Sequence, residues 1–326
     1  MIPPFTLTPK ILNLVAAISQ FVGHFEYEEA RNLHLRKENR IQTIHASLAI
    51  ERNSLTLAQV TDIINGKRVL GKPQEIQEVK NAFEAYELLL SFNPYSLDDL
   101  LKAHGILSKD LVKHSGQLRK SDVGIFDDAG NVVHMGARPE YLAKLITDLL
   151  DWGRTSDLHE LIKSAVIHYE LEVIHPFEDG NGRMGRLWQT LVLSQYHELF
   201  AWLPIETLVY EHQSQYYTVL AEADKLNEST PFIEFMLETI LETLEKASDK
   251  QSDKASDKLS KTEQKVWQAI SNYLAENDFI TTGKLNELIS KSSATSNRYL
   301  QKFVTVKRLI KVGDKKATKY FLNDLL

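Results

Sequence analysis

The feature that most constrains this sequence is a short, glycine-containing loop between two apolar segments. The loop lies in the run HPFEDGNGRMGR, from His175 to Arg186. Before it, residues 156–171 carry apolar side chains at helical spacing, with Ser156 as a predicted N-cap; after it, residues 187–193 form a second apolar run. Backbone amides at the start of a helix attract anions, and glycine lets a loop turn sharply into a helix. We therefore expect a helix–loop–helix that binds phosphate.

The charged residues of this run suit a reaction on a nucleotide polyphosphate. Arg183 and Arg186 are three residues apart, so both can reach phosphate oxygens from one helical face. Asp179 is a candidate metal ligand. His175 is a candidate base, because the pKa of an ordinary imidazole lies near neutrality. The alternative is a helix–loop–helix whose charges face solvent, but packing alone does not require these residue types at this spacing.

The run resembles the signature of the Fic family, His-x-Phe-x-Asp/Glu-Gly-Asn-Gly-Arg-x-x-Arg, at every fixed position. The resemblance implies a mainly α-helical Fic core with a β-hairpin flap, and transfer of AMP from ATP, with Mg²⁺, to a Ser, Thr or Tyr hydroxyl of a target protein or of the chain itself. An inactive copy of the fold is the alternative, but no fixed position is altered. The implied roles are general base for His175, Mg²⁺ ligand for Asp179, cradle of the α- and β-phosphates for Gly180, Asn181 and Gly182, outer-phosphate contact for Arg183, and γ-phosphate or inhibitory-carboxylate contact for Arg186.

The two glycines favour the nucleotidyl-transferring branch of the family. Some relatives that transfer phosphate carry Lys at the position of Gly182, and relatives that transfer phosphocholine can carry Ala at the position of Gly180. This chain has glycine at both positions. The resemblance therefore implies AMP as the default group, while the base of the nucleotide stays open.

A hairpin is predicted between residues 116 and 138. Val123, Ile125 and Val132 lie on either side of the turn-forming sequence DDAGN. The segment resembles the flap that precedes the Fic loop, and an exposed strand edge there could bind an extended target segment by strand addition. The alternative is an ordinary surface hairpin. We interpret His134, on this segment, as a solvated surface histidine rather than a catalytic one.

The sequence SLAIERNSLTL, residues 47–57, resembles the inhibitory helix of the family, Ser/Thr-x-x-x-Glu followed by Gly or Asn. Ser47 and Glu51 fit this pattern, and Asn53 matches a common following Asn, but Arg52 stands where the family residue is small. The resemblance implies that Glu51 pairs with Arg186 and occupies the γ-phosphate position. The alternatives are a surface glutamate without function, or a carboxylate that positions water to remove AMP from the target.

Two tyrosines near the end of the resemblance are candidates for contact with adenine. They are Tyr216 and Tyr217, in a segment that reads as helical. A tyrosine from this region can pack against the base in the family, but an aromatic residue of the core is an equal alternative.

The composition fits a globular chain of several domains. It contains no cysteine, which excludes disulfides, thiolate catalysis and cysteine-based zinc sites. No apolar stretch is long enough to span a membrane and no signal peptide is recognised, so we expect a cytoplasmic location. The expected domains are an N-terminal helical region (1–100), a Fic core (101–245), a polar linker (246–260) and a C-terminal domain (261–326).

The C-terminal domain differs in charge from the rest of the chain. Its twelve Lys and Arg and six Asp and Glu residues give +6, whereas the whole chain carries −6. Three predicted helices and a hairpin resemble a winged helix-turn-helix, with Asn297 and Arg298 on the third helix as candidate DNA contacts. Further candidates, near the wing, are Lys315, Lys316 and Lys319. The alternative is a module for dimerisation or target binding.

Three functions therefore compete. The first is an autoinhibited AMP transferase, for which the resemblance also implies a homodimer. The second is a DNA-binding regulator whose core senses nucleotide without turnover, although the intact His175 argues against it. The third is a toxin that a separate partner protein inhibits. The internal Glu51 makes such a partner unnecessary.

Overall fold

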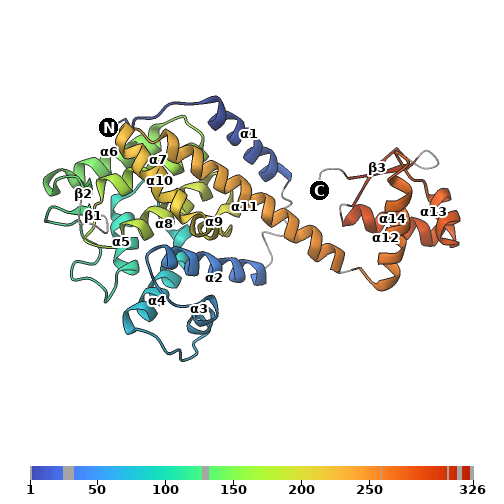
Figure 1. Cartoon of the computed structure of the whole chain (residues 1–326), viewed down its shortest axis with the longest axis horizontal. Helices are drawn as coiled ribbons and strands as arrows, with labels where there is room; N and C mark the ends of the chain where they lie inside the picture. Colours follow the sequence, from blue (N-terminus) through green and yellow to red (C-terminus); the bar gives the residue numbers. More distant parts are fainter. Residues whose placement is uncertain are drawn as a thin grey trace. The chain divides into compact units, whose positions relative to one another are not determined.

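Helices form most of the chain in the computed structural model, as the sequence predicts (Figure 1). The structure describes residues 2–24, 33–126, 132–257, 259–306, 308–313 and 318–323. The chain divides into two units, Met1–Leu244 and Glu245–Leu326. Helix α11 (Thr230–Asp257) continues from the first unit through the polar repeat, so most of the expected linker is helical.

The first unit contains ten further helices, a two-stranded hairpin and three short 3₁₀ turns in its described part. The helices are α1 (Pro9–His24), α2 (Leu33–Ile50), α3 (Leu57–Ile64), α4 (Pro73–Glu87), α5 (Leu97–Leu107), α6 (Leu142–Thr155), α7 (Glu160–Ile174), α8 (Asn181–Tyr196), α9 (Ile205–Glu211) and α10 (Gln213–Leu226). The hairpin consists of β1 (Gly124–Phe126) and β2 (Val132–Met135), and the 3₁₀ turns are η1 (Leu89–Ser91), η2 (Pro139–Tyr141) and η3 (Glu198–Ala201).

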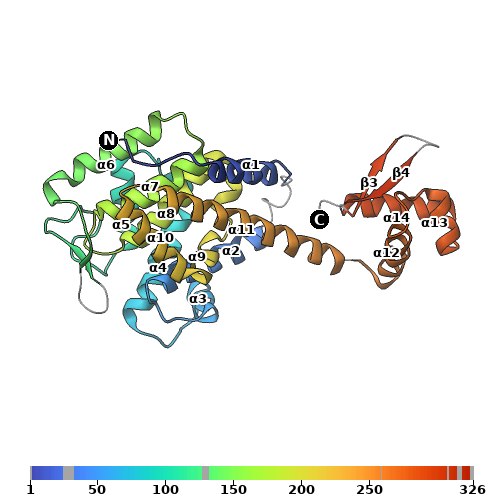
Figure 2. The same cartoon turned by 45° about the horizontal axis from the view of Figure 1, so that its top comes forward.

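Helices α7 and α8 form the centre of the first unit and lie side by side in both views (Figures 1 and 2). Both helices are buried around most of their circumference, which is typical of a core helix rather than an amphipathic surface helix. Trp188 of α8 is fully buried, and its indole N–H donates to the carbonyl of Pro94 at 2.9 Å. The loop that connects α7 and α8 therefore begins and ends on rigid, packed elements.

The start of α7 differs from the prediction. Ser156 is the C-cap of α6, and α7 begins four residues later at Glu160. The N-cap is His159, whose ring Nδ1 accepts a hydrogen bond from the amide of Leu161 at 3.2 Å. An imidazole nitrogen can accept in the same way as the serine oxygen that the sequence suggested, so the prediction of Ser156 as the cap of α7 was wrong.

The predicted hairpin is confirmed. Strands β1 and β2 are antiparallel, with Gly124 opposite Met135 and Ile125 opposite His134, and an irregularity follows Ile125. Its tip, residues 127–131, lies outside the described residues. The hairpin joins α5 to α6, so both of its ends return to the core.

Helix α2 packs against α9 and also contacts α4 and α8. The chain turns directly after Ile50, and buried Asn53 holds the turn by donating to the carbonyl of Glu75 at 3.2 Å and to Glu78 at 2.7 Å. The next helix, α3, starts with a capping box between Thr56 and Gln59. The segment that follows α2 is therefore fixed on both sides.

The second unit has its own core. Helices α12 (Lys261–Leu274), α13 (Thr282–Ile289) and α14 (Ser293–Thr305) are followed by the antiparallel strands β3 (Leu309–Val312) and β4 (Lys319–Leu322). Ile280, between α12 and α13, pairs with Tyr320 of β4. Its most deeply buried hydrophobic residues are Ile270, Ile280, Leu285, Leu300 and Phe303.

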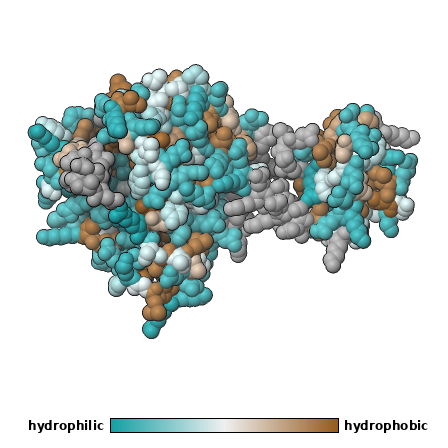
Figure 3. Space-filling model, in the orientation of Figure 1, coloured by the Kyte–Doolittle hydropathy of each residue, from teal (hydrophilic) through white to brown (hydrophobic). Residues whose placement is uncertain are grey.

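The face shown in Figure 3 is mostly hydrophilic, with hydrophobic residues in small, scattered groups. This distribution is ordinary for a protein whose apolar residues are largely in the core. Among the described helices, none combines the length and the apolar composition needed to cross a lipid bilayer.

Candidate active site

His175 is the residue at which α7 ends. It adopts a left-handed conformation, with φ of 50° and ψ of 61°, which redirects the chain into the loop. Its ring Nδ1 lies 3.3 Å from the carbonyl oxygen of Glu172. A carbonyl can only accept, so this bond places the proton on Nδ1 and the lone pair on Nε2. The neutral ring thus has the tautomer that a base at Nε2 requires.

The loop is closed by its own side chains and by a histidine that sequence reasoning missed. The Asn181 side chain accepts from the amide of Phe177 at 2.9 Å and donates to its carbonyl at 3.0 Å. His104 of α5 stacks on buried Phe177 with the ring centroids 3.7 Å apart. The Asn181 side chain is therefore used within the loop, which leaves its backbone amide for the expected cradle role.

His104 also fixes the backbone at the centre of the loop. Its Nδ1 accepts from the amide of Gly116 at 3.0 Å, so its Nε2 donates to the carbonyl of Asp179, also at 3.0 Å. Burial lowers the pKa of His104 to about 4, which keeps the ring neutral in this arrangement. In the sequence, the only signal for this role of His104 is that a single histidine lies in an apolar helix.

The loop leads into the N-terminus of α8, where the sequence predicts phosphate binding. Gly180 is its N-cap, with φ of 82°, a conformation that glycine adopts without strain. The first amides of this 16-residue helix, from Asn181 onward, lack partners within the helix and carry partial positive charge. A Cβ atom at Gly182 would overlap a carboxylate oxygen of Glu51, so glycine here permits the approach of a charged group.

Asp179 and Arg183 form an ion pair across the start of α8. Arg183 Nη2 lies 2.8 Å from Asp179 Oδ2, and the Asp179 side chain is 54% exposed. In the part of the chain that the structure describes, no three His, Cys, Asp or Glu side chains gather as a metal site. A single accessible carboxylate nevertheless fits Mg²⁺, which is usually held by one or two carboxylates together with phosphates and water.

Arg186 joins α8 to the end of α2. Its Nη2 donates to Glu51 Oε1 at 2.7 Å and to the carbonyl of Ser47 at 3.0 Å, and its Nε donates to the Ser47 hydroxyl at 3.1 Å. The side chain is only 2% exposed. Burial opposes its charge, but Glu51, together with Tyr216 and Glu172, outweighs burial and raises the pKa of Arg186. The structure thus brings together all three residues of the expected inhibitory contact.

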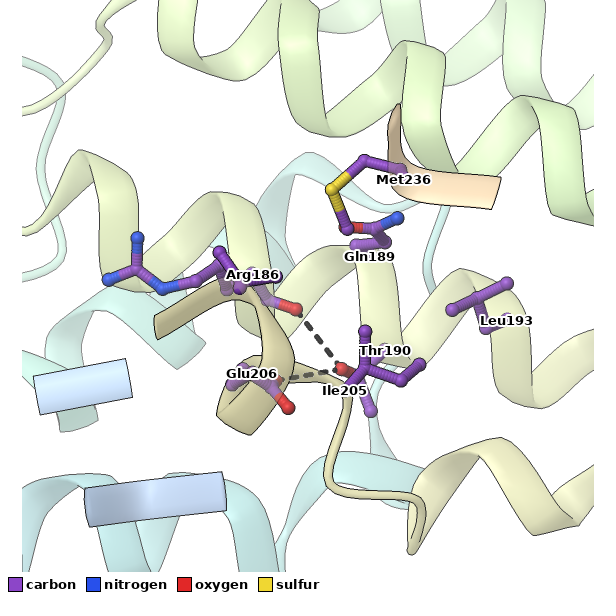
Figure 4. A pocket seen from close by; sticks show the side chains of 8 residues that line it. Arg186, Gln189, Thr190, Leu193, Ile205, Glu206 and Met236 are labelled. Atoms are coloured by element: carbon purple, nitrogen blue, oxygen red, sulfur yellow. Dashed lines mark hydrogen bonds between the residues drawn. The ribbon is translucent and has the colours of Figure 1, made fainter. Parts of the chain in front are cut away.

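A small cavity of about 10 Å³ lies beside Arg186 (Figure 4). The Thr190 hydroxyl is 3.1 Å from the Arg186 carbonyl and 3.2 Å from Glu206 Oε1, while the Arg186 guanidinium extends away from the cavity. Burial raises the pKa of the Glu206 carboxyl. The cavity is far too small for a nucleotide.

The two candidate tyrosines differ in exposure. Tyr216 is 1% exposed, and its hydroxyl lies 3.2 Å from His168 Nε2 in the core. Tyr217 is 49% exposed, and its hydroxyl donates to the carbonyl of Ile50 at 3.3 Å, next to Glu51. Tyr217 is therefore the one of the pair that a ligand could reach without repacking.

The candidate DNA contacts lie on the second unit. Asn297 and Arg298 are exposed on α14, although Asn297 Oδ1 also accepts from the Tyr320 hydroxyl at 3.3 Å. Lys319, on β4, is exposed and lies over the ring of Phe279 at 3.9 Å. Lys315 and Lys316 lie outside the described residues.

Comparison with known proteins identifies a family that includes this region. The model of the Fic/DOC family matches residues 94–193, which contain the whole loop. The chain is 31% identical over 211 residues to the protein adenylyltransferase Fic of Nematostella vectensis, covering 61% of this chain and 47% of that protein. It is 28% identical over 239 residues to the protein adenylyltransferase fic-1 of Caenorhabditis elegans, covering 70% of this chain and 44% of that protein. The matched region thus spans less than half the length of these curated relatives.

Solved structures extend the similarity to the whole chain. A crystal structure of a Fic family protein from Desulfovibrio desulfuricans G20 is 40% identical, with 99% of each chain covered and a TM-score of 0.75. A structure of Fic-1 from C. elegans is 22% identical and covers 74% of this chain and 72% of that chain, with a TM-score of 0.58, which supports the fold alone.

Proposed function

The chain belongs to the Fic family, and from this premise we propose that it is a protein adenylyltransferase that transfers AMP from ATP to a Ser, Thr or Tyr hydroxyl. The observation that carries the proposal is the loop itself. Within twelve residues it places a histidine with the base tautomer, an accessible carboxylate, a helix N-terminus and two arginines. The relatives named adenylyltransferase support the same reaction.

The proposed reaction uses these residues in one displacement. His175 Nε2 accepts the proton of the target hydroxyl, whose oxygen forms a bond to the α-phosphorus. The bond from the α-phosphorus to the oxygen bridging to the β-phosphate breaks, and pyrophosphate leaves. The amides at the start of α8 and the Arg183 guanidinium stabilise negative charge on the phosphates. Asp179 would hold Mg²⁺, which neutralises part of the phosphate charge.

We propose that the target lies along the hairpin. The ends of β1 and β2 are close to the end of α7, since Ala137 donates to the carbonyl of Ile174 at 3.2 Å. A short two-stranded hairpin has an outer edge that an extended segment can join by strand addition. This placement would deliver a side-chain hydroxyl to His175.

We further propose that Glu51 restrains the reaction. Its carboxylate already accepts a hydrogen bond from the guanidinium of Arg186 and lies against Gly182. The outer phosphates of ATP would bind at this place. ATP would then bind only in a position that does not favour in-line attack. Loss of the carboxylate would free Arg186 for phosphate.

The experiment uses ATP labelled at the α-phosphate, with Mg²⁺ and a cell lysate. We expect weak labelling of protein by the wild type, at least tenfold stronger labelling by Glu51→Gly, and none by His175→Ala. The matched control is Glu276→Gly, an exposed glutamate just beyond the end of α12, which should behave like the wild type. Equal labelling by Glu51→Gly and the wild type would contradict the restraint. Labelling that survives His175→Ala would contradict the mechanism.

We also propose that the second unit is a winged helix that binds DNA. Its three helices and hairpin follow one another in the order of such domains, and residues 261–326 carry +6. The proposed contacts with a duplex are Asn297 and Arg298, which are exposed on α14.

A further inference from the structure

Arg119 lies between α5 and the hairpin and is only 3% exposed. Every nitrogen of its guanidinium donates to a backbone carbonyl. Nε donates to His175 at 2.7 Å, Nη1 donates to Ser121 at 2.7 Å, and Nη2 donates to Ala137 and, at 3.3 Å, to Ile174. These carbonyls belong to three segments: the approach to β1, the exit from β2 and the end of α7.

The backbone reinforces the same junction. The amide of Arg119 donates to the carbonyl of Pro176 at 3.0 Å. The amide of Gly136 donates to Val123 at 3.0 Å, closing the base of the hairpin. A Cβ atom at Gly136 would lie 2.8 Å from Arg119 Nη2 and 3.2 Å from the Cβ of His175. The hairpin base, the guanidinium and the histidine are therefore packed against one another.

We propose that Arg119 is a positioning residue that fixes the hairpin relative to His175, so that a hydroxyl held by the hairpin reaches the base. The inference rests on the proposed function. The last carbonyls of a helix lack partners within the helix and favour a cation. At the end of α7, Arg119 donates to two such carbonyls, those of Ile174 and His175. The same planar group also donates to both ends of the hairpin. A lysine has a single nitrogen and cannot donate in these separate directions.

The position of the target oxygen matters because group transfer depends steeply on geometry. A displacement of about 1 Å can lower a rate on the order of 100-fold. The hydrogen bonds of the Arg119 guanidinium to described residues reach the carbonyls on either side of the base and do not include Gly180, Arg183 or Arg186. Its loss should therefore affect transfer far more than it affects nucleotide binding.

The test compares Arg119→Ala and Arg119→Lys in the Glu51→Gly background. Initial rates of label transfer from α-labelled ATP to lysate proteins are measured beside the Kd for ATP. We expect Arg119→Ala to transfer on the order of 100-fold more slowly, Arg119→Lys to be intermediate, and the Kd to change less than about threefold. Millimolar guanidinium, but not ammonium, should restore part of the rate of Arg119→Ala. The matched control is Arg154→Ala, an exposed arginine of α6, which should leave rate and Kd unchanged.

Two results would overturn the proposal. One is a transfer rate of Arg119→Ala within about threefold of its parent; the other is an equal loss of ATP affinity and rate, which indicates general misfolding. Amide hydrogen exchange gives a readout that does not need transfer. If the Glu51→Gly parent transfers no label, the proposed function fails. The positioning role of Arg119 is then tested by amide hydrogen exchange alone. Faster exchange of residues 121–126 and 132–137 in Arg119→Ala, with α8 unchanged, supports the proposed role of Arg119, and identical exchange refutes it.

Discussion

Buried charges near the loop differ in how they are compensated. Arg186 is paired with Glu51 at 2.7 Å, and Arg119 donates to carbonyls. Glu170, on α7, is 6% exposed, and burial alone raises the pKa of its carboxyl to about 7. A carboxyl that is desolvated in this way prefers its neutral form in the folded protein.

This shift makes a prediction for pH dependence. The folded pKa of Glu170 lies above the unfolded value of about 4.5, so its contribution to stability is present below pH 4.5 and is lost as the pH rises through 7. Glu170→Gln stays neutral at all pH values. We expect its free energy of unfolding to exceed that of the wild type by up to about 3 kcal/mol at pH 8, and by little near pH 4.5. Urea denaturation at both pH values measures this.

The exposed Glu222 of α10 provides the matched control for Glu170. Glu222→Gln should shift stability by the same small amount at both pH values. If Glu170→Gln and the wild type lose stability in parallel between pH 5 and pH 8, Glu170 is ionised in the folded protein and the argument from burial is wrong.

At the scale of elements, the turn at the end of α2 explains why a small residue suits the position of Arg52. After Ile50 the chain turns, with the Glu51 amide bonded to Leu48 at 3.0 Å and the Asn53 amide bonded to Leu48 at 3.1 Å. Arg52 takes a left-handed conformation, with φ of 68°. Glycine and asparagine adopt this conformation most readily, which gives a physical reason for a small residue after the glutamate.

Arg52→Gly should relieve this strain and strengthen the contact between Glu51 and Arg186. We expect a gain of about 1 kcal/mol in stability and, because 1 kcal/mol corresponds to about fivefold, a labelling rate lowered up to about fivefold. Arg52→Ala removes the same side chain but keeps the strain, so it isolates the backbone effect. Thermal denaturation and the α-label assay measure both quantities. Equal behaviour of the glycine and alanine variants would rule out strain as the cause.

The sequence predicted local elements better than it predicted their junctions. The loop, the hairpin and α12 to α14 follow from spacing and turn residues that act over a few positions. Ser156 failed as a cap because His159 can accept the same kind of bond. His104 and Arg119 could not be identified because the partners that tie them to the end of α7 and to the loop are 55 to 75 residues away along the chain. Such contacts depend on the tertiary fold and leave no periodic signal.

At the scale of the whole molecule, chemistry and charge are divided between two units. The loop, Glu51, Arg119 and the hairpin belong to the first unit, Met1–Leu244. Residues 261–326 carry +6, which leaves −12 on residues 1–260. A polyanion such as DNA would be attracted to the second unit and repelled by the charge of the first. Any binding to DNA should therefore depend on the second unit and decrease steeply with salt.

Arg298→Ala tests this division on the full-length chain. Fluorescence anisotropy with a labelled duplex of mixed sequence would measure affinity across a range of salt concentrations. We expect Arg298→Ala to bind several-fold more weakly, to lower the slope of log affinity against log salt by about 1, and to label protein as well as its parent. Lys265→Ala, an exposed lysine on α12, is the control with equal loss of charge. If both variants weaken binding equally, net charge rather than α14 accounts for the affinity. If no variant, nor the wild type, binds the duplex at low salt, the second unit serves a protein partner, and its positive charge is an ordinary solvated surface.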